Sequence, residues 1–251
     1  MSFERLQSAL RRAKTPLALG IAPTIDEVAA PLKKQFNEML GSGSLADCEA
    51  LRYHSMQLLE LAEGRLGAVV IDADCFLPYG MMGADVLSNL ITACRAKGIY
   101  SIVDYRTTRP LPYLTAETAP DGITVMPYVG GDAAAEVADK SVFATVLTNN
   151  PTGGEVQSLI AGDRPLYVAL AMQMARRGAG LVVETGYSLD VRELRRRCGS
   201  AFMLLKHCDG ENAVPAFDDY GHNACVVDYS LRSAEDVACA IKELKGWVNI
   251  V

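Results

Sequence analysis

Eight short apolar runs, rich in β-branched residues, constrain the fold of this chain more than any other feature. Each is almost continuously apolar, as expected of parallel strands that are buried on both faces. The runs lie at residues 17–22, 68–73, 100–105, 123–128, 142–148, 180–185, 201–207 and 224–230. Amphipathic stretches of helical period separate them, at residues 25–41, 45–63, 83–97, 154–177, 188–197 and 233–245.

Strands that alternate with helices predict an α/β fold with a parallel sheet, and eight repeats predict closure into a (β/α)₈ TIM barrel. An open doubly wound sheet is the alternative. The chain has 251 residues, half of them apolar, which suits one barrel with a sizeable core. No linker divides the sequence, so we expect a single domain spanning residues 1–251.

The connection after the third run differs from the others. Residues 109–122 contain Pro110, Pro112 and Pro120. Proline removes a backbone donor and clashes with the preceding turn of a helix. We therefore expect the third helix to be shortened or missing.

Composition excludes several classes of protein. A net charge of −6 gives no general reason to bind nucleic acid. No apolar run approaches the roughly 18–20 residues that span a bilayer, and the first residues lack the apolar stretch of a secretory signal. The seven cysteines are scattered and odd in number, which is typical of a reducing compartment. We expect an intracellular protein, with the cytoplasm favoured and an organelle left open.

The carboxyl ends of the strands carry the chemistry of a barrel, and four of these ends share a pattern with one known family. The segments are LGIAP at 19–23, MPYVGGD at 126–132, LTNNP at 147–151 and GLVVET at 180–185. They resemble V-G-L-D-P, N-P-Y-x-G-x-D, T-S-N-P and L-V-V-G-A-T of the orotidine 5′-monophosphate decarboxylases. In order and spacing the resemblance covers residues from about 16 to 245.

This resemblance implies an enzyme that uses no metal and no organic cofactor. The family decarboxylates its nucleotide with a Lys-Asp-Lys-Asp array at the tips of strands two and three, and the neighbouring subunit of a dimer lends the last aspartate. The matching positions here are Asp72, Asp104, Arg106 and Arg109, so only Asp104 is retained. Arginine has a pKa above about 12 and does not give up its proton. Arg106 therefore cannot replace the lysine that protonates the product.

The substituted array still sums to zero charge. We therefore expect Asp72 and Asp104 to pair with Arg106 and Arg109 as a structural cluster, since an unpaired buried charge costs several kcal/mol. Unrelated drift on a solvent-filled barrel mouth is the alternative.

The substrate-holding positions implied by the resemblance have also changed. The ribose-contacting aspartate is Ala22, and residues 206–211 (KHCDGE) replace a glycine-rich phosphate loop. Arg232 could serve as the phosphate arginine only with a shift in register. The serine that reads the pyrimidine is Asn149, so any remaining substrate contact falls on Thr148, Asn149, Asn150 and Pro151.

Histidine and cysteine near the last two strands are residue types that can bind a metal. His207 and Cys208 are adjacent, so their side chains point to opposite sides of a strand, and structural zinc uses ligands a few residues apart. His222 and Cys225 complete the group. We expect no metal site and no cofactor.

Together these features predict a non-catalytic decarboxylase-like barrel that acts as a structural, scaffolding or regulatory module. Its expected partner is another protein, within a larger assembly, with no nucleic acid and no membrane. A homodimer through the mouth stays open, although the proline-rich loop lies where the family's second subunit docks. The alternatives are a working orotidine 5′-monophosphate decarboxylase that makes uridine 5′-monophosphate, or a binder of another small molecule at the mouth.

Overall fold

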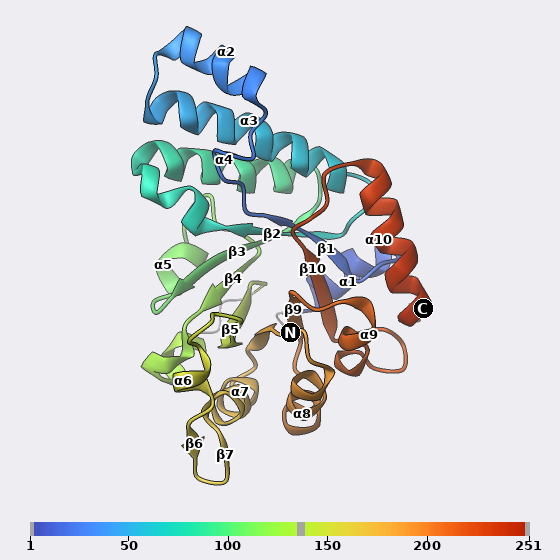
Figure 1. Cartoon of the computed structure of the whole chain (residues 1–251). Coiled ribbons are helices and arrows are strands. Elements are labelled where there is room, and N and C mark those ends of the chain that lie inside the picture. Colours follow the sequence, from blue (N-terminus) through green and yellow to red (C-terminus); the bar gives the residue numbers. More distant parts are fainter. Residues whose placement is uncertain (1–2, 135–138, 249–251) are drawn as a thin grey trace.

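A closed barrel of eight parallel strands forms the centre of the molecule in the computed structural model (Figure 1), which describes residues 3–134 and 139–248. The strands follow the order β1-β10-β9-β8-β5-β4-β3-β2 around the barrel. Closure confirms the TIM barrel and excludes the open sheet. The strands are β1 (Leu17–Ile21), β2 (Ala68–Asp72), β3 (Tyr100–Thr107), β4 (Gly122–Val125), β5 (Ser141–Leu147), β8 (Gly180–Glu184), β9 (Met203–Lys206) and β10 (Ala224–Asp228).

Helices surround the barrel, as the alternating pattern predicts (Figure 1). The longer ones are α1 (Glu4–Ala13), α2 (Ala30–Leu40), α3 (Ser44–Ala62), α4 (Met81–Ala96), α7 (Leu166–Arg176), α8 (Ser188–Cys198) and α10 (Ala234–Trp247). Short helices and 3₁₀ turns fill the loops: α5 (Leu111–Leu114), α6 (Gly154–Gln157), α9 (Gly210–Ala213), η1 (Ala73–Cys75), η2 (Leu77–Tyr79), η3 (Pro127–Val129), η4 (Gly131–Ala134) and η5 (Val214–Ala216).

The proline-rich connection keeps only the short helix α5, which confirms the shortened third helix. The expected helix at 154–177 is wrong in its first half. There the chain forms α6 and then a small antiparallel hairpin, β6 (Ile160–Ala161) with β7 (Arg164–Pro165), before α7 begins. Gly162 turns the hairpin with a φ of +75°, and Pro165 has no N–H with which to extend a helix from the preceding turn.

The core has two layers, one inside the barrel and one between the strands and the helices. Inside, the helix α1 covers the amino-terminal end of the barrel through Leu6 and Leu10. The ring of Phe3 stacks on Phe202 at 5.3 Å between centroids and meets Phe143 edge-on at 5.2 Å. The interior of the barrel is therefore filled by side chains at this end, and the opposite end of the barrel is the mouth.

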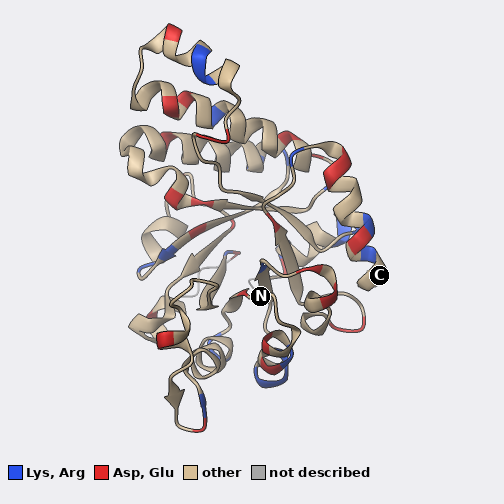
Figure 2. Ribbon diagram, viewed as in Figure 1, with Lys and Arg blue, Asp and Glu red and all other residues tan. Residues whose placement is uncertain are grey.

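Charged residues lie mainly on the helices and loops, while most of each strand is uncharged (Figure 2). The charged residues of the barrel strands lie at the carboxyl ends of those strands, where the mouth opens.

Among the described residues, no helix is both long and apolar enough to span a membrane.

Candidate functional site

Four charged side chains meet at the centre of the barrel mouth. Asp104 and Arg106 come from the end of β3, Glu184 is the last residue of β8, and Lys206 is the last residue of β9. Because strand side chains alternate between faces, Asp104 and Arg106 point to the same side of β3. Glu184 and Lys206 are directly paired in the β8–β9 ladder. The fold thus gathers these residues from distant parts of the sequence.

The four side chains form alternating ion pairs, which we call the mouth cluster. The Lys206 ammonium donates to Asp104 Oδ2 and lies 3.4 Å from Glu184 Oε1. An Arg106 guanidinium nitrogen lies 3.2 Å from Asp104 Oδ2 and 3.7 Å from Glu184 Oε1. The Thr124 hydroxyl donates to the other Asp104 oxygen. Each carboxylate therefore has two cations, and each cation has two carboxylates.

These ion pairs are largely buried. The side chains of Asp104, Lys206 and Glu184 are 0%, 3% and 5% exposed, and Arg106 is 33% exposed. Burial opposes ionisation of Asp104, but Lys206 and Arg106 hold its pKa below the ordinary value. Burial likewise opposes the charge on Lys206, but Tyr229 and Asp104 hold its pKa above the ordinary value. The ion pair between Asp104 and Lys206 is therefore charged at neutral pH.

The backbone is unusual at one residue of the mouth cluster and at one neighbour of the cluster. Arg106 has a φ of +47°, and His207, which follows Lys206, has a φ of +55°. Non-glycine residues rarely adopt this left-handed region, and those that do are often found at functional sites. The Arg106 N–H donates to Thr124 Oγ1 at 2.9 Å, and the β3–β4 ladder is irregular between Val103 and Thr107. Across this irregularity the Arg106 guanidinium still lies 3.2 Å from the Asp104 carboxylate.

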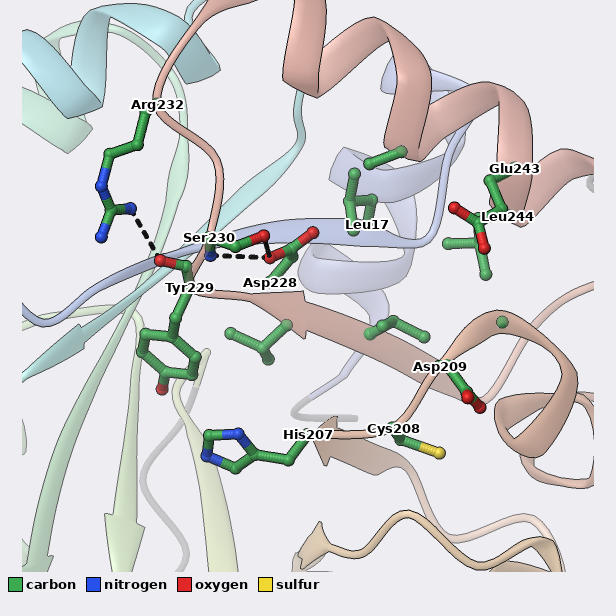
Figure 3. Close-up of a pocket in the computed structure, with 14 residues that line it drawn as sticks. Leu17, His207, Cys208, Asp209, Asp228, Tyr229, Ser230, Arg232, Glu243 and Leu244 are labelled. Atoms are coloured by element: carbon green, nitrogen blue, oxygen red, sulfur yellow. Dashed lines mark hydrogen bonds between the residues drawn. The ribbon is translucent and has the colours of Figure 1, made fainter.

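An aromatic side chain also fills part of the mouth beside the cluster. The ring of Tyr229, just beyond β10, packs on Gly20 so closely that a Cβ at residue 20 would lie 2.3 Å from it. The Lys206 ammonium lies 5.8 Å from the centroid of this ring. The ring also stacks on His207 with centroids 6.0 Å apart, and Figure 3 shows the two rings facing each other. Tyr229 thus occupies space next to β1 that a glycine leaves open.

The expected ion-pair cluster is correct for Asp104 and Arg106 and wrong for the other two positions. Asp72 is half-buried and accepts from the N–H of Asp74 at 3.0 Å, but it makes no ion pair within the described residues. Burial raises the pKa of its carboxyl. Arg109 is exposed and likewise makes no ion pair in the described part of the chain; its N–H donates to Thr107 Oγ1 at 3.1 Å.

The residues expected to hold substrate lie in the loop after β5. Two hydrogen bonds join Thr148 to Gln157. The Thr148 N–H donates to Gln157 Oε1 at 3.1 Å, and Gln157 Nε2 donates to Thr148 Oγ1 at 2.6 Å. The residues Asn149, Asn150 and Pro151 are exposed. No hydrogen bond or ion pair found within the described ranges joins this loop to the mouth cluster.

A cavity of about 680 Å³ lies at the ends of β9 and β10, beside α10 (Figure 3). The resemblance places the phosphate loop here. Three carboxylates line it, those of Asp209, Asp228 and Glu243. The guanidinium of Arg232 is engaged by Glu27 at 3.3 Å and by the Tyr229 carbonyl at 2.7 Å. This composition opposes the binding of a phosphate dianion.

The histidines and cysteines do not assemble into a metal site. Within residues 3–134 and 139–248, no group of three or more His, Cys, Asp or Glu side chains could hold a metal ion. His207 stacks on Tyr229, while His222 lies beside Asp218. All seven cysteines are free thiols, and burial raises the pKa of Cys208 to about 12.

Comparison with known proteins gives relatives of a single kind. No protein-family model matches the chain. The orotidine 5′-phosphate decarboxylase of Rhodopirellula baltica is 24% identical over a match that covers 88% of this chain and 79% of the relative. That of Streptomyces coelicolor is 26% identical, covering 71% of this chain and 67% of the relative. The chain is related to the orotidine 5′-phosphate decarboxylases.

Solved structures of orotidine 5′-phosphate decarboxylases share the fold. The Leishmania donovani enzyme superimposes with a TM-score of 0.77 at 22% identity and covers 98% of each chain. A Toxoplasma gondii protein named as an orotidine-monophosphate decarboxylase gives a TM-score of 0.83 at 18% identity, covering 97% of this chain and 96% of its own. The (β/α)₈ barrel is therefore common to these decarboxylases and this chain.

Sequence reasoning missed two members of the mouth cluster, Lys206 and Glu184. In the sequence, Lys206 opens the segment that replaces the phosphate loop, and Glu184 lies within an apolar run. A signal was present, because each is a single charge at the end of an otherwise apolar run, LVVE and MLLK. Charges in that position are almost never buried unless they are paired.

Proposed function

We propose that this barrel is a non-catalytic relative of the orotidine 5′-phosphate decarboxylases that acts as a structural, scaffolding or regulatory protein module. The mouth cluster carries this proposal. Its two cations and two carboxylates neutralise one another at the barrel mouth, where the resemblance implies the family's catalytic array. No charge in the cluster is left over to bind or to strain a substrate carboxylate.

Proton donation is the step that the cluster supports least. A decarboxylase must protonate the carbon that loses the carboxylate, and a general acid works best when its pKa is near the operating pH. Lys206 has a raised pKa because Tyr229 and two carboxylates favour its charged form. Its side chain is 3% exposed, so a substrate could touch the ammonium only after Arg106 or Tyr229 moved.

Substrate binding is weakened at the same time. Ala22 offers no carboxylate to a ribose hydroxyl. The cavity by β9 and β10 carries three carboxylates, which repel a phosphate. These changes affect separate parts of one nucleotide, so restoring a single residue should not restore binding.

A working orotidine 5′-monophosphate decarboxylase is the second candidate. The names of the relatives support it more directly than they support a non-catalytic module. One contact also favours it: Asp104 retains a lysine partner, because Lys206 of β9 approaches it from across the barrel. In this enzyme Lys206 would be the proton donor, and Arg106 and Tyr229 would open over the substrate.

Ligand binding and partner capture test the non-catalytic proposal together. We expect no saturable heat when uridine 5′-monophosphate is titrated into the pure protein in a calorimeter. Chain expressed at its native level should co-purify with a protein partner in constant ratio through two successive columns. Micromolar binding of the nucleotide, together with a free chain in native extracts, would contradict the proposal. Binding of another small molecule at the mouth remains a prediction.

A further inference from the structure

A second cavity lies at the opposite end of the barrel from the mouth. It has a volume of about 560 Å³ and is lined by α1, the end of α4 and the amino ends of β3, β4 and β5. On α1, the residues Arg5, Ser8 and Arg12 are spaced by three and four positions, which places them on one face of the helix. That face lines the cavity.

Four cationic side chains converge on this cavity. Arg5 and Arg12 come from α1, Arg95 from the last turn of α4, and Lys140 from just before β5. Among the described lining residues the only carboxylate is that of Asp121. This excess of positive charge stands out in a chain whose net charge is −6.

The single carboxylate is already engaged by its neighbours. Asp121 Oδ1 accepts from Arg5 at 2.9 Å, and Oδ2 accepts from the Ser101 N–H at 3.1 Å and hydroxyl at 3.2 Å. Arg95 and Lys140 each donate to a backbone carbonyl, of Ala119 at 3.1 Å and of Pro120 at 2.7 Å. Neither makes an ion pair within the described residues, so most of their donors stay available.

Crowding of like charges makes the cavity receptive to an anion. Burial lowers the pKa of Lys140, and the nearby charges of Arg5 and Arg95 lower it further, although Asp121 and Asp139 oppose this. A bound anion would stabilise all of these cations at once. Guanidinium groups present planar pairs of donors that match phosphate oxygens, and pockets of roughly 300–1,000 Å³ suit small ligands.

We propose that this cavity is a binding site for a small multivalent phosphate anion. Arg12, Arg95 and Lys140 contact the anion directly, and Arg5 supports it from its pair with Asp121. The site is formed without any residue of the mouth cluster, so it does not depend on whether the barrel is catalytic.

Calorimetric titration of the full chain with pyrophosphate, at constant ionic strength, tests this site. We expect saturable binding of one anion per chain. Arg12→Glu should weaken it by about tenfold or more, since a hydrogen bond to a charged group is replaced by repulsion. Arg11→Glu is the matched control, because Arg11 immediately precedes Arg12 on α1 and does not line the cavity. Thermal melting should show both variants folded.

Two results would overturn the proposal. One is that pyrophosphate gives only the heat of dilution, or binds equally weakly to the Arg11 and Arg12 variants, which would reduce the effect to general surface charge. The other comes from citrate at the same ionic strength. Phosphate recognition predicts that pyrophosphate binds more tightly than citrate, and equal or tighter binding of citrate would contradict it.

Discussion

Lys206 and Asp104 form a buried ion pair at the centre of the barrel mouth, although 102 positions separate them in the sequence. Parallel strands bring their carboxyl ends together on one side of a barrel, and this places the end of β9 opposite the end of β3. Glu184 and Arg106 complete the arrangement. The pair is therefore a product of the closed topology, which local sequence does not reveal.

Replacing Lys206 by methionine should be strongly destabilising. The change removes one cation from between two buried carboxylates, Asp104 and Glu184, and leaves them only Arg106. Breaking a buried pair in this way typically costs about 3–5 kcal/mol. Urea unfolding should show this loss, whereas Lys242→Met on the exposed side of α10 should change stability by less than about 0.5 kcal/mol. A loss below about 1 kcal/mol for Lys206→Met would show that the pair carries little energy.

Asp72→Asn should stabilise the protein at neutral pH. The pKa of Asp72 is raised by burial in the folded state, so its ionisation opposes folding once the pH exceeds its unfolded value of about 4. Asparagine removes that charge and can still accept from the Asp74 N–H. Unfolding free energies measured by urea at pH 7 and pH 3 should show a gain at pH 7 that disappears at pH 3.

Asp104→Asn should have the opposite sign and serves as the comparison. Lys206 and Arg106 hold the pKa of Asp104 below its ordinary value despite burial. Its contribution to stability is therefore present above about pH 4 and is lost as the pH falls through the folded pKa. The variant should be much less stable than the parent at pH 7, with a smaller difference at pH 3. Equal effects of the two substitutions would refute this electrostatic assignment.

Gly20→Ala should destabilise the barrel by about 1–3 kcal/mol through overpacking. The new methyl group would lie within 2.6 Å of ring atoms of Tyr229. A double-mutant cycle with Tyr229→Ala measures this contact, because the smaller side chain leaves room for the alanine. Additive effects of the two substitutions, measured by thermal or urea unfolding, would mean that the ring does not rest on residue 20.

Arg195→Ala should destabilise the protein by about 3 kcal/mol. The guanidinium is mostly buried and donates to the carbonyls of Ala201 and Asn223, both at 2.9 Å, and so joins α8 to the chain around β9 and β10. Burial also lowers the pKa of Arg195 to about 10. Removing it leaves buried carbonyls without a donor. Arg192→Ala, at an exposed position of the same helix, is the control and should be nearly neutral in urea unfolding.

The barrel and part of its site could be predicted from the sequence because they depend on local patterns. Continuous apolar strands and amphipathic helices are local patterns, and Pro110 and Pro112 mark the shortened third helix directly. The hairpin after α6 was missed because Gly162 and Pro165 interrupt a stretch that otherwise has helical periodicity. Lys206 and Glu184 were missed because ion pairs between strands depend on which ends meet in space. Asp72 and Arg109 were misassigned because charge balance does not specify side-chain direction.

Turnover of orotidine 5′-monophosphate tests the central claim most directly. Pure full-length protein is incubated with the nucleotide, and the pyrimidine absorbance is followed over hours, with Asp104→Ala and Lys206→Met measured beside it. The closed mouth cluster predicts that, with each of the three proteins, the absorbance changes no faster than in the protein-free control. Turnover by the parent protein that Asp104→Ala abolishes would contradict the account and would identify the chain as a decarboxylase.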